Sequence, residues 1–208
     1  MNAISEKGIG LVIDAGANRG QWALELIESG YKGKIHSFEP TSEFRFLHDL
    51  SNPYSNWKCH QVALSDTSGS AALFQASNAN LSTSLLRPSG INEQGFGITF
   101  AEGERVKTIT LDDFFSKREL QPFYLKLDVQ GAEMLVLKGA NSVLKSCLAV
   151  EFESALFPLY DTEWTHHEIA SWLIQRGFEP KQLVITHWDR DLNTVSLDSI
   201  FLRDGNVK

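Results

Sequence analysis

Cysteine is scarce in this sequence. Its 208 residues include only two cysteines, Cys59 and Cys147. They lie far apart, inside apolar stretches, and without the spacing of metal ligands. We therefore expect both to be reduced packing residues, which suits a reducing compartment and excludes a disulfide-stapled scaffold.

Long apolar runs are also missing. No apolar run approaches the ~18 residues that a transmembrane helix needs. The start of the chain, residues 1–8, lacks the basic and apolar regions of a signal peptide. Together these absences predict a cytoplasmic protein that does not enter a membrane.

Basic residues are outnumbered by acidic ones. The chain has 19 Lys and Arg against 26 Asp and Glu, which gives a formal net charge of −7. Affinity for a phosphate backbone depends on clustered Lys and Arg, and the sequence has no local basic stripe. We therefore expect no nucleic-acid partner.

The rest of the composition is that of an ordinary globular protein, with 42% hydrophobic and 22% charged residues. A chain of this length buries roughly 70% of its unfolded surface on folding, so it needs no disulfide or metal to hold a core. No internal repeat or low-complexity tract divides the chain. We predict a single domain over residues 1–208.

Apolar segments rich in β-branched residues alternate with amphipathic segments. This alternation is typical of a parallel sheet with helices on its faces. Core strands are expected at 11–15, 34–39, 58–64, 123–128, 148–153, 178–186 and 196–202. Helices are expected at 21–29, 41–50, 131–144 and 164–176, with a short one from 112. The predicted fold class is α/β, with a doubly wound seven-stranded sheet that is mostly parallel and ends in a hairpin with an antiparallel last strand.

Residues 65–105 interrupt this alternation. Short strand-like pieces at 71–75 and 98–101 are joined by Ser, Asn, Gly and Pro, which favour turns and loops. Regular structure returns at 106–111. We interpret 65–105 as an insertion into the predicted sheet.

A glycine-containing turn follows the first expected strand and leads into the first helix. It includes Asp14, Gly16, Asn18 and Gly20. Glycines at such a turn let a ligand approach the backbone, and the helix N-terminus offers free N–H groups. Asn18 stands where a dinucleotide fingerprint has its second glycine, and no Gly-Lys-Ser/Thr of a phosphate-binding loop follows. The turn therefore predicts an anionic or dipolar ligand of another kind.

Carboxylates follow the next two strands. Glu39 ends the second strand, where an acid accepts hydrogen bonds from ribose hydroxyls in nucleotide-binding α/β folds. Asp66, just after the third strand, is the expected neighbour of an adenine amino group. With the glycine turn, these residues predict an adenosine-containing ligand.

Several segments resemble one family at the expected places. The acid followed by G-x-x-x-G resembles the first motif of Rossmann-like S-adenosylmethionine-dependent methyltransferases. The chain is similar to the FkbM-type members at residues 12–20, 38–40, 62–66, 106–115, 125–133 and 137–140. The most specific part is Lys-Leu-Asp-Val-Gln-Gly-Ala-Glu at 126–133, with Thr-Leu-Asp-Asp before it.

The resemblance implies a Rossmann-like fold, S-adenosylmethionine as cofactor, and O-methylation of a small-molecule or glycan acceptor, commonly a sugar or a polyketide-type product. Two features depart from the family. Gln130 stands where many members have Glu, and the chain starts about ten residues before its first expected strand. We therefore expect the N-terminal cover of longer relatives to be reduced, and residues 75–103 and 156–167 to form the lid over the acceptor.

Four residues are candidates for catalysis. Asp128 ends a central strand where doubly wound sheets present ligands, so it is the first choice for orienting the acceptor. It could instead cap the next helix or pair with Lys126. Glu151 and Glu153 alternate onto one face of the next strand, so one of them is expected at the site.

His167 is a further candidate base, in a neighbourhood that also has a structural explanation. Thr165 and Glu168 have the spacing of a capping box at the start of a helix. The four candidates lack the spacing of metal ligands, so no metal is expected.

Two other functions stay open at this stage. One is a non-catalytic module that binds S-adenosylmethionine or a nucleoside, and only turnover separates it from an enzyme. The other is a nicotinamide-dependent oxidoreductase, which the glycine spacing disfavours. The sequence specifies no oligomeric state.

Overall fold

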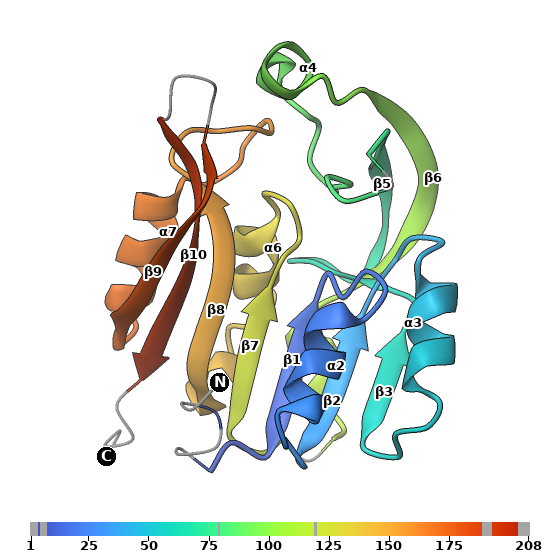
Figure 1. Ribbon diagram of the computed structural model, residues 1–208. Helices are drawn as coiled ribbons and strands as arrows, with labels where there is room; N and C mark the ends of the chain where they lie inside the picture. The colour runs from blue at the N-terminus through green and yellow to red at the C-terminus, as the bar shows by residue number, and fades with distance from the viewer. Residues whose placement is uncertain (1–3, 5–7, 79, 119, 189–192, 204–208) are drawn as a thin grey trace.

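A seven-stranded sheet forms the centre of the structure, a computed structural model that describes residues 4, 8–78, 80–118, 120–188 and 193–203 (Figure 1). The strand order is β3-β2-β1-β7-β8-β10-β9. Neighbouring strands are parallel from β3 to β8, and β10 is antiparallel to both β8 and β9. The strands are β1 (Leu11–Ala15), β2 (Lys34–Phe38), β3 (Trp57–His60), β7 (Phe123–Leu127), β8 (Cys147–Ala155), β9 (Phe178–Trp188) and β10 (Thr194–Arg203). The predicted fold class is confirmed.

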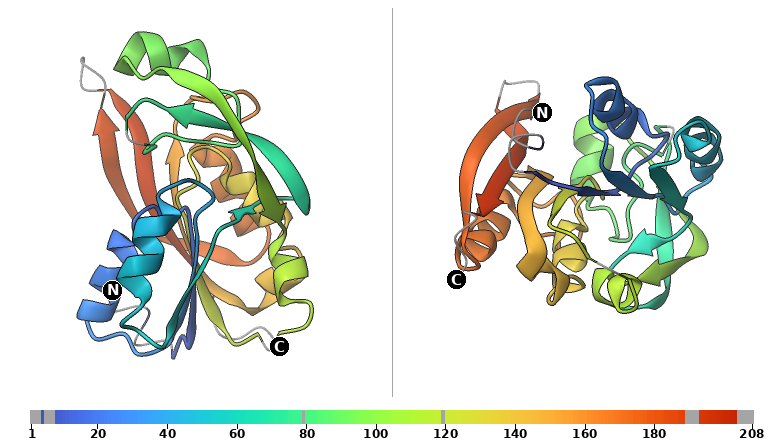
Figure 2. Two further views of the ribbon diagram at one scale, coloured as in Figure 1. Left: turned by 90° about the vertical axis from the view of Figure 1, so that its right-hand side faces the viewer. Right: turned by 90° about the horizontal axis from the view of Figure 1, so that it is seen from below.

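The central strands are apolar because helices cover both faces of the sheet (Figure 2). Every residue of β1 and β7 is buried. Two helices, α2 (Gln21–Glu28) and α3 (Phe44–Ser51), pack on one face. The opposite face is covered by α5 (Leu111–Phe115), α6 (Glu133–Lys138) and α7 (His166–Ile174). Because β10 alone is antiparallel to its neighbours, all the other strands of this sheet end at the same edge. In such folds, ligands bind above that edge.

The predicted helix at 131–144 is shorter in the structure. It ends at Lys138, and a separate 3-10 turn, η1 (Val143–Ser146), follows. The chain bends at Gly139, where a Cβ would lie 2.0 Å from the backbone oxygen of Ser65. The Asp112 carboxylate then accepts the N–H of Ser142 at 2.9 Å, which starts the new turn.

The predicted strand at 58–64 is divided between two sheets. Its first part is β3, and its last two residues form β4 (Ala63–Leu64) in a three-stranded sheet of order β4-β6-β5. That sheet also holds β5 (Gly69–Ala76) and β6 (Phe100–Ile109), so the regular segment at 106–111 belongs to it and not to the main sheet. The predicted insertion thus runs on to residue 109, because its strands pair with each other.

The second sheet rises beyond the carboxyl edge of the main sheet, with α4 (Gly90–Phe96) at its far end (Figure 1).

The two cysteines are free thiols, Cys147 buried and Cys59 half-buried. Among the described residues, no helix is long and apolar enough to span a bilayer.

Candidate functional site

The turn after β1 brings the ends of three strands together. Gly16 adopts φ +75°, and a Cβ on it would lie 1.8 Å from the backbone oxygen of Asp128. Its N–H donates to the oxygen of Phe38 at 3.1 Å, and the N–H of Asp128 donates to that of Ala15 at 3.0 Å. Only glycine fits this approach, so Gly16 fixes the distance between the turn and the end of β7.

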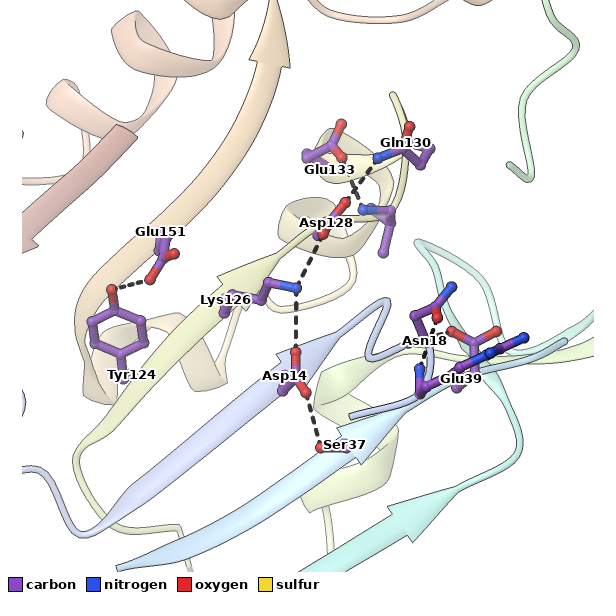
Figure 3. A network of polar contacts seen from close by, with 12 residues as sticks. Asp14, Asn18, Ser37, Glu39, Tyr124, Lys126, Asp128, Gln130, Glu133 and Glu151 are labelled. Atoms are coloured by element: carbon purple, nitrogen blue, oxygen red, sulfur yellow. Dashed lines mark hydrogen bonds and ion pairs between the residues drawn. The ribbon is translucent and has the colours of Figure 1, made fainter. Parts of the chain in front are cut away.

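Glu39 is held in place by backbone amides. Its carboxylate accepts the N–H of Asn18 and the N–H of Thr41, each at 2.8 Å. The residue is only 5% exposed, and burial raises its pKa although these hydrogen bonds oppose the rise. Asn18, which donates this N–H to Glu39, takes a left-handed φ of 49° (Figure 3).

A cavity of about 100 Å³ opens over this turn. Four predicted residues line it, namely Gly16, Asn18, Glu39 and Asp128. Apolar side chains complete it, including Phe38, Leu64 and Leu73, and the segment at 80–85 supplies a further wall. The first cavity thus combines a fixed carboxylate with apolar walls.

Three other predicted cofactor residues lie away from this cavity. Asp14 is fully buried, accepts the Ser37 hydroxyl at 2.9 Å, and pairs with Lys126 at 3.5 Å. Gly20 packs against Leu47 and Trp57 beneath the turn. Asp66 is exposed, and its carboxylate accepts hydrogen bonds from the hydroxyls of the residues before and after it. In this structure Asp14 and Gly20 therefore support the turn from below.

Asp128 stands between two cavities, because both the first cavity and a second, larger one are lined by Asp128 and Gln130. One carboxylate oxygen of Asp128 accepts from Gln130 Nε2 at 2.8 Å, and the other lies 3.2 Å from Lys126 Nζ (Figure 3). Burial alone would lower the pKa of Lys126, but Asp128 and Asp14 raise it above its usual value. The pairing with Lys126 expected as an alternative is thus present, and the Asp128 carboxylate still faces both cavities.

The second cavity has a volume of about 390 Å³ and is lined by Glu153 and His187, among others. Gln130 Nε2 also donates to Glu153 at 3.3 Å, so one amide joins the carboxylates of β7 and β8. The other Glu153 oxygen lies 3.1 Å from Ser196 Oγ and 3.4 Å from His187 Nδ1. Of the two strand carboxylates considered, Glu153 therefore lies at the site.

Glu151 and His167 are not brought to Asp128. Glu151 accepts the hydroxyl of Tyr124 and lines neither cavity (Figure 3). His167 is exposed, and its Nδ1 lies 2.9 Å from Thr165 Oγ1. Glu168 accepts the N–H of Thr165 at 2.8 Å, so the capping box is formed.

Glu133 and His187, which were not among the predicted site residues, lie at the site in the structure. Glu133 is 1% exposed, and its Oε1 accepts the N–H groups of Val129 and Gly131, which braces the turn after β7. Burial raises its pKa well above the usual value. His187 is the second-last residue of β9 and lines the second cavity at the ligand-binding edge. Its place at the end of a strand was the one available signal.

No group of three or more His, Cys, Asp or Glu side chains among the described residues is arranged to hold a metal ion. The carboxylates of Asp128 and Glu153 are instead engaged with amide, hydroxyl and ammonium donors.

Comparison with known proteins now identifies the family. The model of the FkbM methyltransferase domain matches residues 14–180. The chain belongs to the FkbM methyltransferase family. The predicted family is therefore confirmed, and the match includes the glycine turn, Glu39 and the Asp128 segment. A curated relative, the 2-O-methyltransferase NoeI of Sinorhizobium fredii, is 27% identical over 168 residues, covering 76% of this chain and 69% of NoeI.

Solved structures show the same fold. An FkbM methyltransferase from Methylobacillus flagellatus superposes with a TM-score of 0.57 at 15% identity, covering 92% of this chain, which spans 43% of that longer one. The magnesium protoporphyrin IX methyltransferase ChlM of Synechocystis, solved with S-adenosylmethionine, gives 0.53 at 10% identity, covering 98% of this chain and 76% of ChlM. TrmK of M. capricolum, solved with S-adenosylhomocysteine, gives 0.52 at 7% identity, covering 98% and 67%. The expected cofactor agrees with what these two proteins carry.

Proposed function

We propose that this family member is an S-adenosylmethionine-dependent methyltransferase, with the cofactor in the first cavity and the acceptor in the second. The observation that carries the proposal is the shared wall, since Asp128 and Gln130 line both cavities. A methyl group crosses between two bound molecules only where their sites meet. The shared wall is such a meeting point, at the carboxyl edge of the sheet.

The residues of the first cavity fit this cofactor. Glu39 offers a buried, rigidly held carboxylate for ribose hydroxyls, and Gly16 leaves the backbone open beside it. The apolar walls suit a purine ring. When bound, S-adenosylmethionine would supply a methyl group on a positively charged sulfur. The cavity is small because residues 80–85 lie over it, so this segment would move to admit the cofactor.

For the acceptor we propose a hydroxyl on a sugar or a small secondary metabolite. NoeI, the curated relative, is named as a 2-O-methyltransferase. A hydroxyl must lose its proton as it is methylated, and Asp128 is placed at the shared wall to orient it and accept that proton. Glu153, joined to Asp128 through Gln130, would assist on the acceptor side.

We propose further that residues 75–103 and 156–167 cover the acceptor as a lid. The N–H of Ser89 donates to the backbone oxygen of Leu159 at 2.9 Å, and the N–H of Asp161 donates to the backbone oxygen of Arg87 at 2.8 Å. The Tyr160 hydroxyl donates to the oxygen of Ser82 at 2.8 Å. These contacts support one cover over the second cavity, which excludes water from the reaction.

Cofactor binding can be tested at Glu39. In Glu39→Gln the side chain loses its charge and one of its two acceptor oxygens. Hydrogen bonds to a charged group contribute roughly 1.5–3 kcal/mol, so calorimetry should show a ten- to hundredfold loss of affinity for S-adenosylhomocysteine. Glu28→Gln, an exposed change of the same kind on α2, is the control and should have no effect. Unchanged affinity in Glu39→Gln would mean that Glu39 does not hold the ribose.

Catalysis can be tested at Asp128. Asp128→Asn keeps the size of the side chain and removes its charge. The rate at which S-adenosylhomocysteine forms in the presence of the acceptor should therefore fall at least ~100-fold. Cofactor affinity should stay within about threefold. The exposed Asp49→Asn on α3 is the matched control.

Other outcomes of the Asp128 experiment would change the role assigned to Asp128 or the proposed activity. Loss of cofactor binding or of folding in Asp128→Asn would make Asp128 a cofactor or structural residue, and Glu153 the next candidate base. Cofactor binding by the unchanged protein without turnover on any sugar or small hydroxyl compound would favour the non-catalytic binding module.

A further inference from the structure

The second cavity is lined by more acidic side chains than methylation of a hydroxyl requires. Four carboxylates line it, those of Asp128, Glu133, Glu153 and Glu163. Of the described residues on its walls, none is Lys or Arg, and His187 is the single side chain there that can become a cation. Carboxylates gathered in a hollow are costly unless a cation joins them.

Glu133 provides an independent sign that this cavity takes a hydrogen-bond donor. Its Oε1 braces the turn after β7, but its Oε2 is buried with no hydrogen-bond partner among the described residues. Buried carboxylate oxygens in folded proteins nearly always have a donor. This oxygen belongs to a residue that is 1% exposed and lines the cavity, so a donor on a ligand would satisfy it.

The nearest lysine does not supply the missing charge. Lys126 lies behind Asp128, and its ammonium is shared with the buried Asp14 at 3.5 Å. Lys126 is therefore engaged with those two aspartates and does not pair with Glu133, Glu153 or Glu163. One oxygen of Glu163 accepts the N–H groups of Leu159 and Tyr160, so its other oxygen is the one available to the cavity. Burial, with the neighbouring carboxylates, raises the pKa of Glu133 and of Glu163. A bound cation would favour their ionised forms and release protons.

Neutral polar groups complete the lining. Asn78, Ser82, Tyr160 and Ser196 also lie on the cavity wall and can bond to hydroxyl groups. We propose that the second cavity accepts a hydroxyl-bearing ring that carries a protonated amine, the chemistry of an aminosugar. The amine lies among Glu133, Glu153 and Glu163, and the hydroxyl that is methylated lies at Asp128. This assignment rests on the proposed function for the identity of the reaction.

Neamine, a two-ring aminosugar with four amines, is a suitable probe, and its fully N-acetylated form is the neutral counterpart. Calorimetry on the protein with and without S-adenosylhomocysteine should show neamine binding at least about tenfold more tightly than the acetylated form, because charge-assisted hydrogen bonds are the stronger ones. Glu153→Gln should weaken neamine binding about fivefold or more, whereas Glu28→Gln should leave it within about twofold.

Equal affinity for the two compounds, binding of neither, or an equal loss in Glu153→Gln and Glu28→Gln would overturn the aminosugar assignment. The equal loss would mean that neamine responds to the overall negative charge and not to the cavity. Cofactor binding is measured on the same protein and is independent of these results. If S-adenosylhomocysteine binds while neamine shows no preference, the methyltransferase proposal stands and the aminosugar assignment falls.

Discussion

Gly16 shows how a single residue sets the geometry of the site. It is one of several glycines with positive φ, but a Cβ added to it would also collide with the backbone oxygen of Asp128. Gly177 has a similar φ of +81°, and a Cβ added to it would meet nothing within 4 Å. The two glycines therefore separate the cost of a left-handed backbone from the cost of a steric clash.

Replacing these two glycines by alanine should give different losses of stability. Gly177→Ala should lower the free energy of unfolding by about 1 kcal/mol, the lower end of the cost of a left-handed non-glycine residue. Gly16→Ala should lower it by about 1–3 kcal/mol more, because β1 and β7 must move apart. Urea denaturation measures both losses. Similar losses in the two variants would show that the contact with Asp128 relaxes without cost.

At the scale of elements, two segments far apart in sequence meet above the carboxyl edge of the main sheet. The loop before α7 and the segment after β5 are joined by the Tyr160 hydroxyl, which donates to the oxygen of Ser82. Ser82 lines the second cavity, and its neighbours at 80–85 form a wall of the first. One hydrogen bond thus connects the covers of both cavities.

Tyr160→Phe should loosen this cover. Loss of a buried hydrogen bond costs about 0.5–1.5 kcal/mol, so affinity for S-adenosylhomocysteine should fall about two- to tenfold. Amide hydrogen exchange at residues 80–85 should become faster. Tyr31 lies far from the site, and its hydroxyl has a 3.5 Å contact to the oxygen of Lys34. The control variant Tyr31→Phe should therefore change neither measurement. Unaltered exchange at 80–85 in Tyr160→Phe would mean that this hydrogen bond does not couple the covers of the two cavities.

At the scale of the whole molecule, buried acids make stability depend on pH. Burial raises the folded-state pKa of Glu133 well above its ordinary value. The folded protein then keeps a proton that the unfolded chain releases. The contribution to stability is complete below the ordinary pKa, and it is lost as the pH rises through the folded-state pKa.

Glu133→Gln removes this loss, because an amide does not ionise and can still accept the two N–H groups of the turn. From about pH 5 to pH 8, its free energy of unfolding relative to the unchanged protein should rise, by at most about 1.4 kcal/mol per pH unit. Urea denaturation at several pH values measures this difference. For the exposed Glu28→Gln the difference should be flat, and a flat difference for Glu133→Gln would show that Glu133 is ionised at no extra cost.

The sequence by itself determined the α/β class, the glycine turn, the place of Glu39 and the segment around Asp128. These features depend on local periodicity and on the order of elements along the chain, which in a parallel sheet puts the ends of successive strands at one edge. The helix start at Thr165 and Glu168 was also local, since its hydrogen bonds span three residues.

Only the tertiary structure decided which polar residues face a cavity. Alternation put Glu151 and Glu153 on one face of the strand. In the structure Glu151 is bound by the hydroxyl of Tyr124, whereas Glu153 lines the second cavity. The strand predicted at 58–64 was divided because Ala63 and Leu64 find partners in β6, some 45 residues later. A strand pattern states which side chains share a face, whereas contacts with distant segments decide what covers that face, and hence which carboxylates are buried, paired or open to a ligand.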